Sequence, residues 1–446
     1  MAPKIVLLAG EESGDGHGAR LVTALRRLAP GVEIHGMGGP RMAAAGMQLI
    51  RSFDGMQIMG FWEVLKNLAL VRRVFGEVET AIRGLKPDLV CGIDYPGFNL
   101  RMEKRCKGLG MRTAHYIAPQ VWAWKKGRAR RMAQYVDLLI PIFDFEAPFF
   151  TPHGLRTEFV GHPLIEGYDR AALWARANDL AERLGLSAAK WSGPEAMVGE
   201  QRPVQPLVVL PGSRRQVLEH HLERFVRAAE QARLGLGRSA DQMPILLARP
   251  AGAAALPIWR SVEGRVRFVE GNLQEAVFLG QAALTSSGTA TLEAGLTGTP
   301  MTVAYVGGRL SAGVAHLVVD IPVISLVNIV LGGYLVEEFL QGEASVGRLA
   351  GELKRLCSDR PVRERMHARL LTLAARLGFQ SVAASGEARG ASGAGLAPSE
   401  RAAAALLRCA GWTAPPEGNS SNSESVAAVA DNPGASVASG NGARAE

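Results

Sequence analysis

The sequence contains little cysteine, and its cysteines are scattered. Only four occur in 446 residues, and none forms a C-x-x-C pair or a Cys/His group with zinc-ligand spacing. A disulfide scaffold is therefore excluded, and nothing indicates a structural metal. We expect a cytosolic protein that needs neither a metal nor a bound cofactor.

Long apolar runs are also missing. The first, residues 5–9, is followed at once by glycine and acidic residues, so it is too short for the core of a signal peptide. The most apolar stretch, residues 317–336, is broken by Asp320, Pro322, Asn328 and two glycines. It cannot form an uninterrupted membrane span, so any membrane contact is expected to be peripheral.

Positive charge is in excess. The formal net charge is +8, which favours nucleic acid, an anionic membrane surface or phosphorylated substrates as partners. Two groups of cations stand out within residues 101–131, and a solvated helix face explains them equally well. Their members are Arg101, Lys104, Arg105, Lys107 and Arg112, then Lys125, Lys126, Arg128, Arg130 and Arg131.

Solid apolar runs alternate with helical patterns, which is typical of a parallel sheet covered on both faces. In the first half these runs include KIVLLAG, VEIHGMG, PDLVCGID, RTAHYIAP, VDLLIPI and TEFVGHP, with helices expected over residues 19–28, 40–45 and 100–109. After an irregular stretch at residues 187–206 the pattern restarts with PLVVLPGSR, a helix over about 217–234, PILLARP and VRFVEG. The sequence therefore predicts two α/β halves, and it shows no internal repeat.

We predict four segments. Residues 1–165 form a Rossmann-like domain, residues 166–375 form a second one, and residues 376–412 are a linker with a helix that packs back onto the body. Residues 413–446 contain no Phe, Trp, Tyr, Ile or Leu, so this tail is expected to be disordered. The fold class is α/β, with two doubly wound domains facing across a cleft.

The loop after the first strand, AGEESGDGHGA, carries three glycines near polar Asp15 and His17. The glycines permit tight turns and close backbone approach. The loop matches the dinucleotide fingerprint only in its weaker form, with Ala19 in the last position, and it lacks the Gly-Lys-Ser/Thr of a P-loop. Alone, it could merely turn the chain.

Asp94 stands where the third strand leaves the sheet, in GIDYPGFN. Its apolar neighbours could raise its pKa enough for general-base chemistry. It could equally cap a helix that starts near Leu100. His17, His115 and His162 also lie at strand ends or at the helix start beyond one, where a histidine is more often structural.

Two loops of the second half suit an anionic ligand. In LPGSR, residues Gly212, Ser213 and Arg214 lie between a strand and a helix. In TSSGTATLEAG, Ser286–Thr289 supply small residues and hydroxyls at a helix start, with Glu293 one turn later. Amides there can hold a diphosphate while the carboxylate binds ribose hydroxyls. Helix capping explains either loop singly, but both together favour a sugar nucleotide.

Taken in order, AGEESGDGHGA, GIDYPGFN, HYIAPQVWAWKKGR, FVGHP, LPGSR and SSGTATLEAGLTGTPM resemble the lipid-A-disaccharide synthase family. The resemblance covers about residues 3–359. It implies the GT-B architecture of two Rossmann domains. It also implies an inverting transfer of diacylglucosamine from UDP to the 6-hydroxyl of diacylglucosamine 1-phosphate (lipid X), which gives the β(1→6) lipid A disaccharide.

The resemblance also assigns roles. Asp94 is the expected general base and His17 the alternative. The acceptor side is expected to include Glu11, Ser13, Asp15 and Asn99. The nucleotide is expected to be bound by Gly212, Ser213, Arg214, Ser287, Gly288, Thr289, Glu293 and Asn328. No metal is required if helix N-termini and Arg214 compensate the diphosphate charge.

Acylated substrates place such an enzyme at the cytoplasmic face of the inner membrane. Residues 60–75 combine apolar and basic side chains in the manner of an interfacial helix, although apolar residues at this spacing commonly face a core. The predicted membrane contacts are Phe61, Trp62, Leu65, Leu68, Arg72 and Arg73. The basic groups would attract anionic lipid and the acceptor phosphate. Nucleic acid is not an expected partner, and a homo-oligomer is left open.

The chain departs from the family pattern at several positions. The family usually has Asp where Gly97 stands, and basic residues at the positions of Val306, Asp320 and Gly333; Val327 replaces a proline. Either other residues hold UDP, or activity is reduced or donor choice altered. Two alternatives therefore stay open: another GT-B enzyme acting on UDP-N-acetylglucosamine, such as an epimerase, and a catalytically silent sugar-nucleotide or lipid-binding protein.

Overall fold

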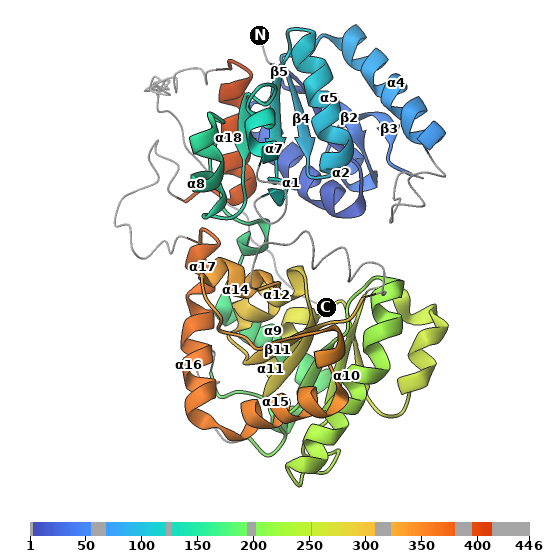
Figure 1. The fold of residues 1–446 in the computed structure, drawn as a ribbon, viewed down its shortest axis with the longest axis vertical. Helices are drawn as coiled ribbons and strands as arrows, with labels where there is room; N and C mark the ends of the chain where they lie inside the picture. The colour runs from blue at the N-terminus through green and yellow to red at the C-terminus, as the bar shows by residue number, and fades with distance from the viewer. Residues whose placement is uncertain are drawn as a thin grey trace, which may run out of the picture. The chain divides into compact units, whose positions relative to one another are not determined.

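The computed structural model describes residues 3–54, 68–121, 127–193, 202–250, 252–307, 323–379 and 395–412. Within these residues the chain forms two six-stranded sheets, and every strand pair in both is parallel (Figure 1). The prediction of an α/β fold with two doubly wound sheets is confirmed.

The first sheet has the order β3-β2-β1-β4-β5-β6. Its strands are β1 (Lys4–Ala9), β2 (Glu33–Gly38), β3 (Gln48–Ser52), β4 (Leu89–Ile93), β5 (Arg112–Tyr116) and β6 (Leu138–Ile140). Alternate residues of β1 belong to different apolar clusters: Ile5, Leu7 and Ala9 to one, Val6 and Leu8 to another. Both faces of the sheet are therefore covered, which is why the central strand β4 and all of β1 after Lys4 are apolar.

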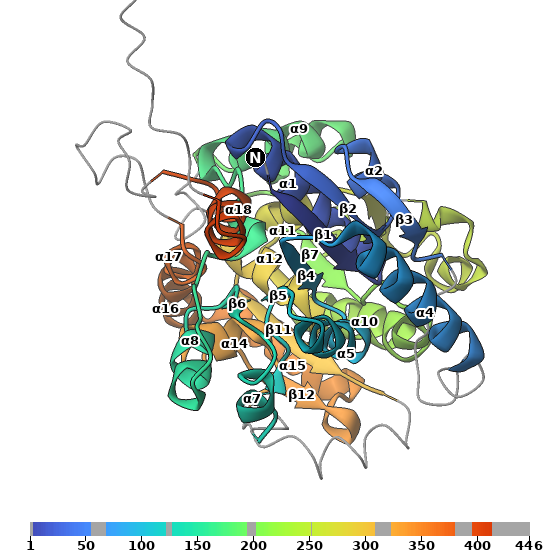
Figure 2. The same cartoon turned by 90° about the horizontal axis from the view of Figure 1, so that it is seen from above.

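Helices from distant parts of the chain cover the two faces. On the face of Val6 and Leu8 lie α4 (Leu68–Leu85) and α5 (Pro96–Gly108). On the other face lie α1 (Glu12–Leu28) and the last helix, α18 (Pro398–Cys409), which pack against each other (Figure 2). Arg401 of α18 donates to the carbonyl of Val160 at 2.7 Å, which fixes α18 to the first half.

The second sheet repeats the topology, with the order β12-β11-β10-β7-β8-β9. Its strands are β7 (Leu207–Leu210), β8 (Ile245–Arg249), β9 (Arg267–Glu270), β10 (Ala282–Ser286), β11 (Met301–Tyr305) and β12 (Glu338–Leu340). The helices around it are α9 (Arg170–Arg183), α10 (Arg215–Gly235), α11 (Leu273–Leu279), α12 (Thr289–Thr297), α14 (Leu326–Leu331), α15 (Val346–Ser358), α16 (Arg360–Leu371) and α17 (Leu373–Arg376).

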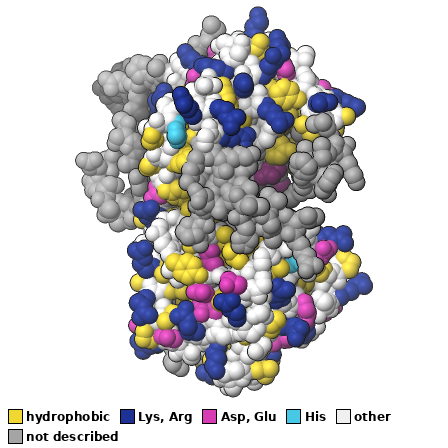
Figure 3. Space-filling view, in the orientation of Figure 1, with side chains coloured by type: hydrophobic (Ala, Val, Ile, Leu, Met, Phe, Trp, Pro, Cys, Tyr) yellow, Lys and Arg dark blue, Asp and Glu magenta, His cyan; other side chains and the backbone are white. Residues whose placement is uncertain are grey.

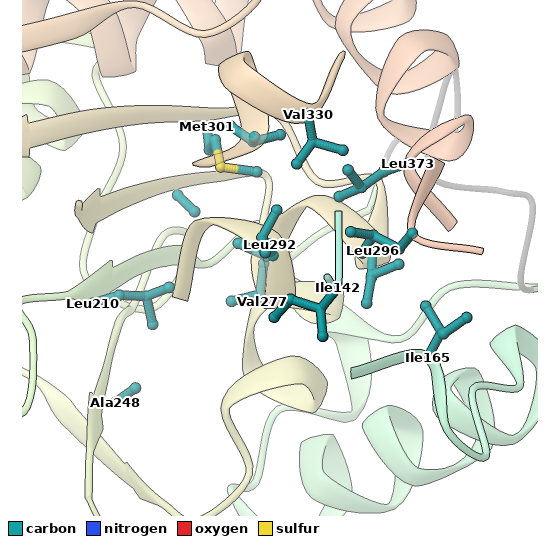
Figure 4. Packing of buried hydrophobic residues seen from close by; sticks show 14 of the residues in the cluster. Ile142, Ile165, Leu210, Ala248, Val277, Leu292, Leu296, Met301, Val330 and Leu373 are labelled. Carbon is teal, nitrogen blue, oxygen red and sulfur yellow. The ribbon is translucent and has the colours of Figure 1, made fainter. Parts of the chain in front are cut away.

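Helix α12 is buried on nearly every side. Its Leu292 and Leu296 lie among Val277, Val330 and Leu373, which come from three other helices (Figure 4). This environment explains its sequence, TATLEAGLT, which is apolar or small apart from Glu293. The position of the N-terminus of α12 is therefore fixed by packing.

The remaining elements are short. The helices are α2 (Pro40–Ala44), α7 (Gly127–Met132) and α8 (Glu146–Phe150); the 3₁₀ turns are η1 (Thr151–His153), η2 (Pro163–Ile165), η3 (Ser187–Ala189), η4 (Ala253–Ala255), η5 (Pro257–Val262) and η6 (Gln341–Glu343). Within the irregular stretch expected at residues 187–206, Trp191 is buried, and the guanidinium of Arg202 lies 3.3 Å from its ring centroid.

Two expectations about local structure are wrong. Helix α1 begins at Glu12, so Gly14, Gly16 and Gly18 belong to the helix, not to a loop. Gly18 is needed for close packing, since a Cβ on it would lie 2.4 Å from the Met42 sulfur. The strand expected in TEFVGHP is only an isolated bridge between Leu139 and Thr157, because the chain leaves the sheet and turns at Gly161, where φ is +92°.

Candidate functional site

Each sheet has a point at which its strand order reverses. In the first sheet this point lies between β1 and β4, and in the second it lies between β7 and β10. Ligands of open α/β sheets bind at such points, beyond the carboxyl ends of the strands. The predicted site residues follow β1, β4, β7 and β10, which are the four strands that flank these two points.

The nucleotide-side residues line one cavity. A pocket of 410 Å³ lies at the carboxyl ends of β7 and β10 and collects both predicted anion loops. Its walls include Gly212, Ser213, Arg214, Ser287, Gly288, Thr289 and Glu293. The structure thus brings seven of the eight predicted nucleotide residues together; the eighth, Asn328, lies elsewhere.

The backbone around this cavity presents the N-termini of two helices. Gly212 and Gly288 have φ of +101° and +134°, conformations that favour glycine, and they precede α10 and α12. The first amides of both helices have no intrahelical acceptor and suit an anion. Arg214 is exposed at the start of α10, and within the described residues no carboxylate pairs with it.

Glu293 lines the same cavity one turn into α12. Burial raises the pKa of its carboxyl, and the negative charge of Glu275 raises it further. A carboxylate that burial has deprived of water is stabilised by hydrogen bonds from hydroxyl groups, and a ribose provides such hydroxyls.

Arg249 is a wall residue that the sequence did not reveal. It ends β8, lines the cavity, and lies 3.3 Å from a carboxylate oxygen of Glu270. Its guanidinium is 4.8 Å from the Phe268 ring centroid. Only the pairing of β8 with β9 places these three residues together, and no local motif marks them.

Asn328 is not among the residues that line the cavity, and its contact with nucleotide stays a prediction. Its side chain is fully buried: Nδ2 donates to Glu338 and to the carbonyl of Val336, and Oδ1 accepts from two amides. Glu338 also binds the amides of Ile324 and Ser325. Because the carbonyl of Ile324 accepts from the Ser287 hydroxyl at 3.1 Å, Asn328 supports the cavity indirectly.

At the first switch point, Asp94 and Tyr95 occupy an unusual backbone conformation. Their φ values are +48° and +47°, both left-handed and neither at glycine. The Asn99 side chain fixes this turn by donating to the carbonyls of Leu8, Ile93 and Asp94 at 3.0, 3.2 and 2.7 Å. Asn99 is fully buried and holds the turn, and its place on the acceptor side stays a prediction. Strain of this kind is concentrated at functional sites.

The side chain of Asp94 is partly buried, and it does not cap α5. That helix begins at Pro96 with Tyr95 as N-cap and has no side-chain cap hydrogen bond. Burial raises the pKa of Asp94, Glu11 raises it further, and His115 lowers it. Glu11 therefore lies near Asp94, and Ser13 donates to the Glu11 carboxylate at 2.6 Å.

Asp15 binds backbone amides of the neighbouring strand end, and its place on the acceptor side stays a prediction. Its side chain is 1% exposed, and its carboxylate accepts from the amides of Gly39, Arg41 and Met42 at 2.8 to 3.0 Å. It thereby caps α2 at the neighbouring strand end.

His17 lies near Arg20 and His162. Burial and the Arg20 charge lower the pKa of His17 to about 4, so its ring is neutral near pH 7. His162 accepts from the amide of Leu164 at 3.0 Å, as a structural histidine does.

A buried acid–base pair lies beneath the Asp94 turn. His115 Nδ1 is 2.7 Å from Glu103 Oε1, and both side chains are fully buried. Gly92 leaves room for the carboxylate, since a Cβ there would be 2.3 Å from Oε1. Of this pair, only His115 stands out in the sequence; its partner Glu103 comes from α5, the helix that precedes β5.

The basic residues of the first half fall into two groups. Arg105 and Lys107 are paired with Glu79 and Asp137 at 2.7 and 2.5 Å. Lys104, Arg128 and Arg131 instead line a hollow of 330 Å³ with Gln134 and Tyr135. Figure 3 shows Lys and Arg side chains on the viewed face over the elements of the first sheet.

The predicted membrane segment is only partly described. Phe61, Trp62 and Leu65 lie outside the described residues, as does the Leu68 side chain. In α4, Arg72 and Arg73 are exposed, whereas Val74 and Val78 are buried against the sheet. From residue 74 onward the apolar stripe therefore serves the core. Among the described helices, none combines the length and apolar character needed to cross a bilayer.

The fold places the chain in a known class. Over 92% of its length it resembles CalG4, the calicheamicin glycosyltransferase, with 99% of that chain covered, a TM-score of 0.52 and 16% identity. It also resembles the UDP-GlcNAc 2-epimerase of Neisseria meningitidis, with a TM-score of 0.50 and 11% identity over 84% of this chain and 97% of that one. Two such sheets with loops at both switch points define the GT-B fold.

Sequence comparison gives the family. The model of lipid-A-disaccharide synthetase matches residues 5–390. The lipid-A-disaccharide synthase of Anaeromyxobacter dehalogenans strain 2CP-1 is 36% identical over 380 residues, covering 85% of this chain and 94% of that protein. That of Alkalilimnicola ehrlichii is 36% identical over 412 residues, covering 92% and 99%. The chain belongs to the lipid-A-disaccharide synthase family, and the predicted resemblance is confirmed.

Proposed function

We propose that the protein condenses UDP-2,3-diacylglucosamine with 2,3-diacylglucosamine 1-phosphate. The products are the β(1→6) disaccharide 1-phosphate and UDP, with inversion at the anomeric carbon. The observation that carries this proposal is the single cavity in which both anion loops, Arg214 and Glu293 meet. Family membership supports the reaction class.

The cavity binds the UDP part of the donor. The amides that begin α10 and α12, with the Arg214 guanidinium, hold the diphosphate. Glu293 accepts hydrogen bonds from the ribose. These groups stabilise UDP more as negative charge develops on it, so they act on the transition state. The proposal assigns no metal, because these groups supply the compensating charge.

Asp94 acts on the acceptor. Its carboxylate takes the proton of the 6-hydroxyl as that oxygen attacks the anomeric carbon. The new C–O bond forms while the bond from the anomeric carbon to the diphosphate oxygen breaks, and the electron pair leaves with UDP. A carboxyl whose pKa is raised by burial is a stronger base than a solvated one. His17 is the weaker candidate, because its pKa is lowered to about 4.

Acylated substrates require contact with the cytoplasmic face of the inner membrane. Among the described residues that line it, the hollow of Lys104, Arg128 and Arg131 has three cations and no carboxylate, which suits anionic headgroups. Arg72 and Arg73 add exposed charge on α4. We propose peripheral attachment through these cations.

A product assay tests the reaction directly. Purified protein is incubated with the two acylated precursors, and the disaccharide 1-phosphate and UDP are measured by mass spectrometry. Appearance of both in equal amounts is the expected result. UDP binding without product would instead favour a silent binding protein, which the departures at Gly97, Val306 and Gly333 would then explain.

A further inference from the structure

His221 has a chemically defined position next to the nucleotide cavity. It lies on the second turn of α10 and is fully buried. Its Nε2 lies 2.8 Å from the amide nitrogen of Val306, and its Nδ1 lies 3.1 Å from the carbonyl oxygen of Pro211. An amide can only donate and a carbonyl can only accept, so Nε2 is unprotonated and Nδ1 carries the hydrogen.

The ring has little freedom to turn. It stacks on Phe225 with the centroids 4.7 Å apart and the planes 9° from parallel, and it meets Tyr305 edge-on at 5.8 Å. Burial lowers the pKa of His221 to about 4, which keeps the ring neutral and Nε2 free to accept. Both hydrogen bonds are therefore kept across the neutral pH range.

The two hydrogen-bond partners of His221, Pro211 and Val306, lie on opposite sides of the loop that follows β10. Pro211 follows β7 and Val306 follows β11, and β10 runs between these strands. The loop after β10 contains Ser287 and Gly288. Gly212, next to Pro211, lies close to that loop, since a Cβ on it would be 3.2 Å from Ser286 Oγ.

We propose that His221 is a positioning residue for nucleotide binding. The two hydrogen bonds of His221 form a bridge that sets the distance between the loop at residues 211–214 and the end of β11. This role rests on the proposed function of the cavity. The amides beyond Pro211 then face the diphosphate without reorganising. The bridge also gives a role to Val306, where the family usually has a cation: its backbone amide anchors the wall.

Paired substitutions test the proposal. His221→Phe keeps a flat ring against Phe225 but removes both hydrogen bonds, and His220→Phe makes the same change at the exposed neighbour. We expect calorimetry to show UDP binding roughly tenfold weaker for His221→Phe and unchanged for His220→Phe, since each lost bond contributes modestly. His221→Gln, whose amide can donate and accept, should recover part of the affinity. Equal affinity of wild type and His221→Phe would overturn the proposal.

Thermal melting separates positioning from general support. If His221 only supports the fold, the His221→Phe protein will melt at a lower temperature, but its folded molecules will bind UDP as wild type does. That result also overturns the proposal. If wild type itself binds no UDP, the proposed function of the cavity fails.

Nitrogen-15 NMR of histidine-labelled protein tests the bridge in the wild type itself. The His221 resonances, assigned by their loss in His221→Gln, should show a protonated Nδ1 and an unprotonated Nε2 at neutral pH. The opposite tautomer, or a charged ring, would overturn the inference whatever the outcome with UDP.

Discussion

The ring of Tyr95 lies directly on Gly10, so that a Cβ built on Gly10 would be 2.2 Å from Tyr95 Cδ1. The contact joins the loops that follow β1 and β4, the two central strands of the first sheet. It brings Glu11 close to Asp94, and the electrostatic effect of Glu11 on both Asp94 and Tyr95 follows from it. The surroundings of the proposed base, Asp94, therefore come from two loops and not from one.

Asp94→Asn should abolish most turnover while preserving nucleotide binding. Asparagine keeps the shape of the side chain and tolerates the left-handed conformation, but it cannot accept the proton. We expect kcat to fall by roughly 10²–10⁴-fold, with UDP affinity by calorimetry unchanged. A comparable fall in affinity would contradict the assignment of Asp94 to the acceptor side.

The rate should depend on pH through Asp94. Burial raises the pKa of Asp94 above its ordinary value, and only the ionised form acts as base. Activity should therefore be present above the raised pKa and lost as the pH falls through it. The acid limb of kcat/KM should have its midpoint above the ordinary aspartate value of about 4. A midpoint at or below that value would argue against Asp94.

The same raised pKa affects folding stability in the opposite direction to activity: activity is lost as the pH falls, whereas stability is lost as the pH rises. A carboxyl that is harder to ionise when folded contributes stability at low pH, and that contribution is lost as the pH rises through the folded pKa. Asp94→Asn should thus have a higher melting temperature than wild type at pH 7 to 8, and the gap should close in acid. Asp88→Asn, at an exposed aspartate, provides the comparison.

Arg214→Gln should weaken UDP binding, whereas Arg215→Gln should not. Arg214 lines the cavity, while its exposed neighbour Arg215 pairs with Glu219 at 3.0 Å. A lost hydrogen bond to a charged phosphate corresponds to roughly 10- to 100-fold in affinity. Calorimetry with UDP measures both variants, and equal affinities would remove Arg214 from the phosphate site.

Gly92→Ala should destabilise the first half. The added Cβ would lie 2.3 Å from Glu103 Oε1 and 2.7 Å from Asn99 Cβ, and neither buried group can retreat. Overpacking of this kind costs about 1–3 kcal/mol in unfolding free energy. Gly97→Ala is the matched control, because a Cβ there meets nothing within 4 Å. Denaturant titration should separate the two variants.

Vesicle binding should depend on the cations of the hollow, which pair with no carboxylate in the part of the chain that the structure describes. Lys104→Gln with Arg131→Gln removes two charges from the hollow, while Arg105→Gln with Lys107→Gln removes two that already face carboxylates. Each unpaired charge is worth about 1 kcal/mol near an anionic surface. Co-sedimentation with phosphatidylglycerol vesicles should therefore weaken more for the first pair. Equal losses would indicate that net charge alone governs attachment.

Sequence could predict what local chemistry determines. The strands could be predicted from their apolar runs. The loops at Gly212–Arg214 and Ser287–Thr289 could be predicted because small residues, hydroxyls and a cation directly follow a buried strand. The roles predicted for Asp15 and Asn328 stay predictions, because each polar side chain binds backbone groups brought near by folding, and local sequence does not reveal such partners. Arg249 and His221 were missed because their partners lie on other strands.

The left-handed pair at Asp94 and Tyr95 affects how variants of this site can be interpreted. Branched substituents such as Val, Ile or Thr at either position oppose the backbone geometry itself, whatever their chemistry. In a library randomised at these two codons, most variants would be inactive because their residues disfavour the left-handed backbone conformation, not because they lack a proton acceptor. Informative libraries are those restricted to Asp, Asn and Gly, in which the turn survives and only the proton acceptor changes.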